Sequence, residues 1–556
     1  MTAPLTHGQA PAPLSLSQYL MATLEGYGVD TVFGIPGVHT VELYRALAAS
    51  SLRHVTPRNE QGAGFLADGY ARASGRVAAC FVITGPGMTN IATAMGQALA
   101  DSVPMLVISS VNPVGRMGSG EGWLHEMPDQ RGLAAQLAAF SHTVLDPAEL
   151  PRVLARAFAV FRSGRPAPVH IEIPVDLFAR AMPVGTVAQA TPTPSRPVAD
   201  AGVLTELAQA VSTAQNPVIL AGGGAADAAS DLRSLAEALD APVVMTVNGR
   251  GILPDDHPLA VPCSPALPPV RQLIENADLV LAFGTEMGPA EYDFYNRGGL
   301  TLKGRLIRVD IDGQQMMRGP RADPAILSDC GAALRALSGM DPATGKGAAR
   351  APGAARAKET RDAVRADTSP IYATGQALLG DLRDALPKSV IVGDSAQPVY
   401  AGLMHFGTNR PRAWFCSATG FGTLGYAVSA ATGAWLATGQ PAIAVIGDGG
   451  LQFNLGEIAT AREIGCPLII LLWNNNGYLE IKNYMERRDI PTLGVDIFTP
   501  DFQMLAKGFD CHALRISGAE GLADALVQAA GRDRPTLIEL DEAAYHAAMQ
   551  AHSQEA

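Results

Sequence analysis

The sequence lacks the features of secreted, membrane-spanning and nucleic-acid-binding proteins. Its six cysteines are scattered without any CxxC pair, which argues against zinc sites and disulfides and predicts a cytoplasmic protein with reduced thiols. The net charge is −12 and no long run of Lys and Arg occurs, so no nucleic-acid or anionic-membrane partner is expected. The longest apolar stretches, such as 468–473, are too short to span a bilayer. Residues 1–13 have no apolar signal core and are expected to form a short tail.

Aromatic residues are also scarce, at 6%, whereas the chain contains 58 glycines and 40 prolines. Hydrophobic residues make up 47% of the sequence and charged residues only 17%, which favours large folded cores over disorder. Short β-branched runs alternate with helical patterns, and such runs are typical of parallel strands buried on both faces. We therefore predict an α/β protein whose strands include residues 31–33, 78–83, 105–108, 169–173, 218–220, 279–283, 306–309, 390–392, 443–446 and 468–472.

Two stretches rich in Pro, Ala and Gly, near 191–197 and 341–356, interrupt this pattern and resemble interdomain linkers. They divide the chain into three predicted doubly wound parallel-sheet domains. We place an N-terminal domain at 14–190, a central Rossmann-like domain at 196–340, a linker at 341–366 and a C-terminal domain at 367–546.

The most informative segment is 443–478, which reads as strand, Gly-rich turn, helix, strand and Asn-rich loop. Asp448 lies among Gly447, Gly449 and Gly450, and Asn475 follows the second strand. Glycines let the backbone approach an anion, and Mg²⁺ prefers carboxylate, amide and phosphate oxygens. Parallel βαβ geometry brings both strand ends to one edge of the sheet. A structural turn followed by an unrelated loop is the alternative.

A GDG motif followed by a double Asn resembles the thiamine-diphosphate signature of the acetolactate synthase and 2-oxo acid decarboxylase family. The resemblance implies that the N-terminal domain binds the pyrimidine and the C-terminal domain the diphosphate. It implies that Asp448, Asn475 and the carbonyl of Gly477 hold Mg²⁺, and that Tyr478 adjoins the cofactor. Similar segments run through 15–545, so the family's usual homo-oligomer is expected, a dimer at minimum and commonly a tetramer with sites shared between chains.

Two further segments match the family. Glu60 precedes a helix of small residues at 63–72 and corresponds to the glutamate that activates the cofactor; a plain helix N-terminal acid is the alternative. In the GFGTLG segment at 420–425, Leu424 corresponds to the apolar residue that bends the cofactor, and the carbonyl of Gly422 would face its pyrimidine. An ordinary Gly-rich loop is the alternative there.

The substrate is indicated less directly. His125 could carry a proton near neutral pH, or be a surface histidine. His39 is a candidate pocket residue, and Val38 matches neither benzoylformate decarboxylases nor acetolactate synthases. Glu480 could face the substrate, or be a solvated loop acid. Glu480, together with the acids at 121, 126 and 129, would suit a cationic substrate, because carboxylates pair strongly with guanidinium.

The motifs resemble 5-guanidino-2-oxopentanoate decarboxylases, which implies release of CO₂ and 4-guanidinobutanal in arginine catabolism. One alternative is an acetolactate synthase-like carboligase, although the Gln-Trp pair of those enzymes is absent. Another is a non-catalytic homologue, which the presence of Glu60 disfavours. In acetolactate synthases the central domain holds FAD and an Arg follows a glycine there. Here Gly284 is followed by Thr285, Glu286 and Met287, so FAD is expected to be absent.

Overall fold

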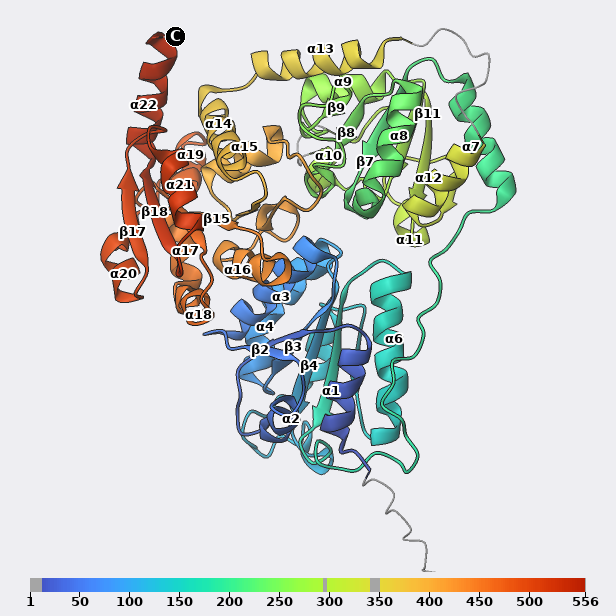
Figure 1. Cartoon of the computed structure of the whole chain (residues 1–556), viewed down its shortest axis with the longest axis vertical. Helices are drawn as coiled ribbons and strands as arrows, with labels where there is room; N and C mark the ends of the chain where they lie inside the picture. Colours follow the sequence, from blue (N-terminus) through green and yellow to red (C-terminus); the bar gives the residue numbers. More distant parts are fainter. Residues whose placement is uncertain (1–12, 294–297, 341–350, 556) are drawn as a thin grey trace, which may run out of the picture.

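The computed structural model describes residues 13–293, 298–340 and 351–555. The predicted tail, apart from Pro13, and residues 341–350 of the predicted linker lie outside these ranges. Three six-stranded sheets, each with every strand pair parallel, form three domains (Figure 1). The predicted fold class is therefore confirmed.

The N-terminal sheet has the order β2-β1-β3-β4-β6-β5. Its strands are β1 (Thr31–Gly34), β2 (Arg53–Val55), β3 (Ala78–Val82), β4 (Met105–Val111), β5 (Phe140–Thr143) and β6 (Pro168–Pro174). Its helices are α1 (Leu16–Gly26), α2 (Val41–Leu47), α3 (Glu60–Ser74), α4 (Pro86–Ala100), α5 (Gln130–Ala135) and α6 (Leu150–Ser163). Helices α1, α2 and α6 pack in one core, and α3 and α4 in another.

The central sheet has the order β12-β11-β10-β7-β8-β9. Its strands are β7 (Pro217–Ala221), β8 (Val243–Met245), β9 (Ala260–Val261), β10 (Leu279–Phe283), β11 (Arg305–Asp310) and β12 (Ala325–Leu327). Its helices are α7 (Ala201–Thr213), α8 (Ala229–Leu239), α9 (Pro268–Glu275), α10 (Pro289–Tyr292), α11 (Gly313–Met316) and α12 (Cys330–Gly339). Part of the predicted linker is helical: α13 (Gly353–Ala366) buries Ala357 and Val364 in the core that contains α9.

The C-terminal sheet has the order β14-β13-β15-β16-β18-β17, which repeats the N-terminal topology strand for strand. Its strands are β13 (Val390–Gly393), β14 (Trp414–Cys416), β15 (Ala442–Gly447), β16 (Ile469–Asn474), β17 (His512–Ile516) and β18 (Thr536–Asp541). Its helices are α14 (Pro370–Ala385), α15 (Gln397–His405), α16 (Ala427–Thr438), α17 (Asp448–Leu451), α18 (Glu457–Glu463), α19 (Leu479–Glu486), α20 (Phe502–Gly508), α21 (Leu522–Ala530) and α22 (Glu542–Glu555).

The N- and C-terminal domains share one hydrophobic core, in which α3 packs against α16 (Figure 1). The helices cross closely at Gly69, where a Cβ atom would lie 1.9 Å from the carbonyl oxygen of Ala430. A buried network reinforces the contact: Arg72 pairs with Asp68 at 2.6 Å and Asp101 at 2.7 Å, and the hydroxyl of Tyr426, just before α16, donates to Asp68. This packing fixes the N- and C-terminal domains against each other.

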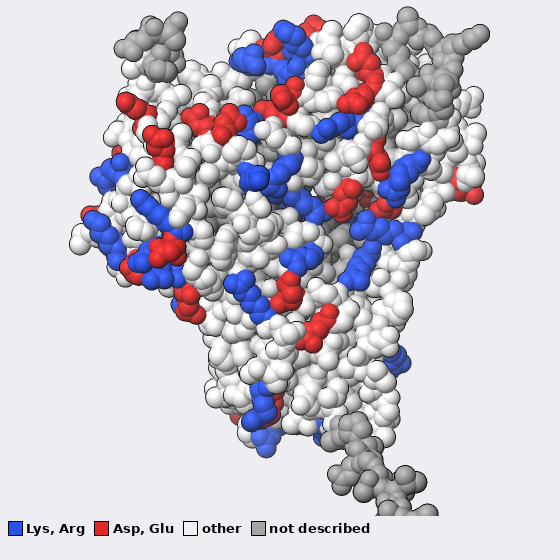
Figure 2. Space-filling view, viewed as in Figure 1, with Lys and Arg blue, Asp and Glu red and all other residues white. Residues whose placement is uncertain are grey.

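The surface carries both signs of charge. On the face in Figure 2, basic and acidic side chains are interspersed over all three domains. Within the described ranges, no helix is long and apolar enough to cross a membrane.

Candidate active site

The edge where β15 and β16 end brings Asp448 and Asn475 together. The two strands are parallel neighbours, with Gly447 paired to Trp473, so both side chains follow adjacent strand ends. Asp448 is 1% exposed. Its carboxylate accepts hydrogen bonds from the backbone N–H of Asn475 at 3.4 Å and from the Thr499 hydroxyl at 3.3 Å. Burial raises the pKa of Asp448, against the lowering effect of these donors. A nearby cation would favour the ionised form of such a carboxylate.

The side chain of Asn475 has a fixed orientation. Its Nδ2 donates to Glu542 at 2.9 Å, and Trp473 Nε1 donates to the same carboxylate at 2.6 Å. Because a carboxylate can only accept hydrogen bonds, the side-chain nitrogen of Asn475 must face Glu542. The Asn475 Oδ1 atom is then buried without a hydrogen-bond partner, on the same sheet edge as Asp448. A buried, unsatisfied oxygen beside a buried carboxylate fits a hard cation that takes oxygen ligands.

The following loop packs closely over this edge. A Cβ atom at Gly449 would lie 2.5 Å from the Tyr478 ring and 3.6 Å from the Gly477 carbonyl oxygen, so glycine is required for this approach. The Tyr478 amide donates to Val495 at 3.0 Å, which anchors the loop. Asp448, Asn475, Gly477 and Tyr478 are therefore brought together as the motif predicts.

This candidate metal site is not a cluster of acidic or histidine side chains. The described residues contain no group of three or more His, Cys, Asp or Glu side chains suited to a metal. The donors at this edge are one carboxylate, one side-chain amide and backbone carbonyls, a set that leaves room for phosphate oxygens of the kind Mg²⁺ favours.

The loop carrying Gly422 and Leu424 is held by an acid that the sequence analysis missed. Asp394 follows β13 and accepts the amide hydrogens of Tyr426 at 2.6 Å and Ala427 at 3.2 Å, at the start of α16. Asp394 is fully buried, and burial raises its pKa to about 6 despite these donors. Gly422 is exposed with φ of +77°, and Leu424 is half-buried. The only sequence signal for Asp394 is an acid at a strand end.

Glu60 begins α3 in the N-terminal domain and is 9% exposed. Its carboxylate accepts a hydrogen bond from Asn90 Nδ2 at 2.9 Å, on α4. The turn before it is held by Glu457 of the C-terminal domain, which accepts the amide hydrogens of Arg58 at 2.9 Å and Asn59 at 3.0 Å. Glu60 is thus a buried acid in the first turn of α3, bonded to Asn90, and the turn before it contacts the C-terminal domain.

The structure pairs two histidines that are far apart in the sequence. The rings of His39 and His125 meet edge to face with centroids 5.4 Å apart. Nδ1 of His39 is buried without a hydrogen-bond partner, and burial, followed by the proximity of His125, lowers the pKa of His39. The His125 carbonyl accepts the Thr84 hydroxyl at 3.3 Å, which fixes the loop.

Three of the four acids considered for a cationic substrate have structural partners. Glu121 accepts a hydrogen bond from Trp123 Nε1 at 3.0 Å, and Asp129 caps α5. Glu126 accepts four donors from its own loop, including the Gly120 amide at 2.7 Å. Glu480, on α19, is half-buried, and within the described part of the chain its carboxylate has no hydrogen bond or ion pair. Burial, then the nearby Glu542, raise its pKa, whereas Arg487 lowers it.

The candidate metal ligands and the candidate cofactor-activating acid lie in two separate groups. Asp448, Asn475, Gly477 and Tyr478 lie on the C-terminal sheet edge, and Glu60 lies beside α4. Across the described ranges, no hydrogen bond or ion pair joins Glu60 to the Asp448 group. The sequence analysis missed Asp394, Glu542 and Asn90, because their roles follow from contacts between segments distant in the sequence.

These domains and this sheet edge define a thiamine-diphosphate enzyme. Models of the thiamine pyrophosphate (TPP, also called thiamine diphosphate) enzyme family match the chain in three parts: the N-terminal TPP binding domain at residues 14–133, the central domain at 204–337 and the C-terminal TPP binding domain at 394–540. The chain belongs to this family.

Curated relatives resemble the chain over nearly its whole length. A probable 2-ketoarginine decarboxylase, AruI, of Pseudomonas aeruginosa is 45% identical, covering 96% of this chain and 95% of that protein. An acetolactate synthase large subunit of Parasynechococcus marenigrum is 30% identical, covering 96% of this chain and 88% of that protein. The acetolactate synthase large subunit IlvB1 of Mycobacterium tuberculosis is 32% identical, with coverages of 95% and 88%.

Proposed function

We propose that this enzyme decarboxylates 5-guanidino-2-oxopentanoate, also called 2-ketoarginine, to 4-guanidinobutanal and CO₂. The similarity to a probable 2-ketoarginine decarboxylase supports this substrate. The structural observation that carries the proposal is the unpartnered, half-buried carboxylate of Glu480, three residues beyond Gly477.

Glu480 suits the guanidinium end of this substrate. Its raised pKa means that burial and Glu542 disfavour the ionised carboxylate in the free protein. A guanidinium group would offset this cost, because it pairs with a carboxylate through two parallel hydrogen bonds. A neutral side chain gains nothing from Glu480, so selectivity for a cationic oxo acid follows.

The C-terminal sheet edge would hold Mg²⁺ and the diphosphate. Asp448, the Oδ1 atom of Asn475 and the carbonyl of Gly477 are the proposed protein ligands of the metal, with Glu542 orienting the Asn475 amide. Gly447, Gly449, Gly450 and Tyr478 surround the place for the diphosphate.

When bound, thiamine diphosphate supplies a nucleophilic carbon and an electron sink for the electrons released as CO₂ leaves. Glu60 would exchange a proton with the pyrimidine ring, and Asn90 holds the Glu60 carboxylate in position. Leu424 would support the bent cofactor and the Gly422 carbonyl would accept a hydrogen bond from its amino group. Asp394 anchors the start of α16 and so positions the Leu424 loop.

His125 is proposed to move a proton at a ring nitrogen during product formation. His39 lies against it, and burial, followed by the proximity of His125, lowers the pKa of His39. An imidazole ring can both accept and donate a proton.

We propose that the active site is completed by a second copy of the chain, in a dimer or tetramer. Glu60 and Asp448 belong to separate groups, and the loop beyond Asn475 exposes large apolar side chains, including Leu493 at 85% and Phe498 at 84%. Apolar side chains exposed together mark an interaction surface. Co-expression of Glu60→Gln and Asp448→Asn chains should restore activity in mixed dimers if one site uses both chains. An inactive mixed dimer would place each site within one chain.

The proposed substrate is tested by removing the charge of Glu480. Glu480→Gln should lower kcat/KM for the guanidino acid by roughly 10- to 100-fold, the loss expected when a hydrogen bond to a charged group is removed. The same substitution should leave the rate with 2-oxohexanoate nearly unchanged. Glu486→Gln, at an exposed position of α19, is the control. Equal losses for both substrates would show that Glu480 does not recognise the guanidinium.

The relatives named acetolactate synthases favour carboligation as the second candidate. Incubation with pyruvate, thiamine diphosphate and Mg²⁺ separates the two: acetolactate as the main product would establish the carboligase. A protein that binds thiamine diphosphate but turns over no oxo acid would establish a non-catalytic homologue.

A further inference from the structure

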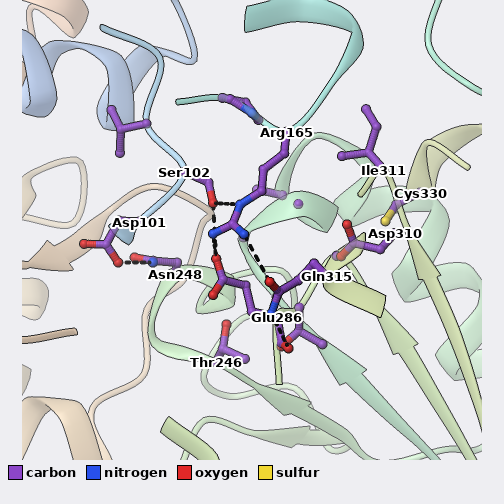
Figure 3. Close-up of a pocket in the computed structure, with 18 of the residues that line it drawn as sticks. Asp101, Ser102, Arg165, Thr246, Asn248, Glu286, Asp310, Ile311, Gln315 and Cys330 are labelled. Carbon is purple, nitrogen blue, oxygen red and sulfur yellow. Dashed lines mark hydrogen bonds and ion pairs between the residues drawn. The ribbon is translucent and has the colours of Figure 1, made fainter. Parts of the chain in front are cut away.

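A cavity of about 360 Å³ lies where β7 and β10 adjoin in the central sheet, and all three domains line it (Figure 3). Ligands of open α/β sheets bind at such a switch point between neighbouring strands. Acetolactate synthases, which this chain resembles, are expected to hold FAD in this domain. Two features of the cavity decide whether a flavin dinucleotide fits: the glycine loop at Gly222–Gly224 and the charged side chains.

The glycine loop, Gly222–Gly224 after β7, has already used two of its backbone donors. The amide hydrogens of Gly222 and Gly224 are donated to the carbonyls of Phe283 at 2.9 Å and Gly284 at 3.1 Å. A Cβ atom at Gly222 would lie 2.1 Å from the Gly284 oxygen, and one at Gly224 would lie 2.9 Å from the Gly284 Cα. The glycines are therefore required by the close packing of two backbone segments. With the N–H groups of Gly222 and Gly224 occupied in this way, two of the three glycine donors cannot bind a diphosphate.

Glu286 extends into the cavity from the loop after β10 (Figure 3). Its carboxylate pairs with Arg165 of the N-terminal domain, and Ser102 donates to it at 3.4 Å. Arg165 also donates to Ser102 at 2.9 Å and to Gln315 at 3.3 Å, so its guanidinium is committed to protein partners. A diphosphate would meet the carboxylates of Glu286 and Asp310. Within the described residues, each arginine that lines the cavity is already paired with an acid: Arg72, Arg165, Arg196 and Arg412.

We infer that the central cavity takes no flavin dinucleotide and that Glu286, Arg165 and Gln315 join the central and N-terminal domains across it instead. Gln315 completes the connection, because its Nε2 donates to the backbone carbonyl of Glu286 at 3.2 Å. The cluster thus contributes interdomain contacts in the place that a dinucleotide would occupy. This inference does not depend on the identity of the oxo acid.

The flavin part is tested on the full-length protein as purified. Acid-released flavin should be far below one per chain, and added FAD should keep the fluorescence of free flavin, with no quenching by the protein. Stoichiometric flavin, or saturable quenching, would overturn the inference. Both readouts are independent of decarboxylase activity.

The interdomain part is tested by thermal unfolding of Glu286→Gln, Arg165→Gln and the double variant. Each single change should lower the midpoint by about 1–2 °C, the scale of a partly exposed ion pair in a large protein, and the double change should lower it by no more than the larger single effect. Arg335→Gln is the control, because Arg335 pairs with Asp231 at 3.2 Å within the central domain, on its surface. Fully additive effects of the Glu286 and Arg165 changes would refute the bridge.

Discussion

Replacing Glu542 by Gln tests whether the proposed metal ligand is held in place by its neighbour. Glu542 accepts two hydrogen bonds, from Trp473 at 2.6 Å and Asn475 at 2.9 Å, and so fixes which atom of the Asn475 amide faces Asp448. A glutamine has one acceptor oxygen and one donor nitrogen, so it can no longer impose that orientation by charge. The chain should still fold, because the side chain keeps its size.

The expected loss follows from the bonds involved. Hydrogen bonds to a charged group contribute about 1.5–3 kcal/mol and neutral ones about 0.5–1.5 kcal/mol, so weakening this contact costs about 1–2 kcal/mol. That is roughly a 10-fold weaker metal affinity, at the lower end of the 10- to 100-fold losses typical of residues that orient metal ligands. Titration with Mn²⁺ in the presence of thiamine diphosphate, followed by electron paramagnetic resonance, measures the dissociation constant directly.

Glu539→Gln provides a matched control. Glu539 holds the amide of Asn474 at 2.9 Å, one residue before Asn475, but Asn474 is not a proposed ligand. The metal affinity of Glu539→Gln should match that of the unaltered protein. An unchanged affinity in Glu542→Gln, or equal losses in both variants, would refute the orienting role of Glu542.

Three further predictions concern Glu60, Glu480 and Asp394. Glu60→Gln should keep the affinity for thiamine diphosphate, measured by calorimetry, but lose at least about 100-fold in kcat, as expected when a proton-transfer group is removed; full activity would contradict the mechanism. KM for the guanidino acid should rise as the pH falls through the raised pKa of Glu480, because the protonated carboxyl cannot pair with guanidinium, and a pH-independent KM would contradict this role. Asp394 has a folded-state pKa of about 6 against an ordinary value of about 3.9, so the folded protein holds a proton that the unfolded chain releases between these values. Stability should therefore fall as the pH rises from 4 to 6, and urea unfolding of Asp394→Asn should show a smaller fall; an identical pH dependence would place the titration elsewhere.

The fold was largely predictable because buried parallel strands have a distinctive sequence pattern. Runs such as 443–446 and 468–472 are apolar on both faces; the first lies within β15, and the second lies in β16 except for its first residue. The helical part of the predicted linker was missed, because α13 has only sparse apolar residues and its burial depends on packing against α9. The shared strand order of the first and third sheets also emerges only from the structure.

The candidate site was predictable where its residues lie in one continuous motif. Asp448 and Asn475 belong to a strand–helix–strand unit whose geometry fixes their proximity. Glu542 could not be predicted, because it lies 67 positions beyond Asn475 and reaches it only through the neighbouring strand β18. The pairing of His39 with His125 likewise depends on two loops of the N-terminal domain that meet in space.

The glycines at 222–224 form a sequence pattern that has two possible structural explanations. A triple glycine after a strand is compatible with a dinucleotide loop in the sequence. The structure explains Gly222 and Gly224 by backbone packing against Gly284, with the N–H groups of both already occupied, and Gly223 by its approach to Asn248. Sequence spacing alone cannot distinguish these two reasons for glycine.

The central claim is tested most directly by measuring products from a set of 2-oxo acids. Purified protein with thiamine diphosphate and Mg²⁺ would be given 5-guanidino-2-oxopentanoate, pyruvate, 2-oxobutanoate and benzoylformate, with CO₂ and aldehyde quantified together. The account predicts fast, equimolar release of CO₂ and 4-guanidinobutanal from the guanidino acid and slow turnover of the others. Faster turnover of pyruvate, with acetolactate as the product, would contradict it.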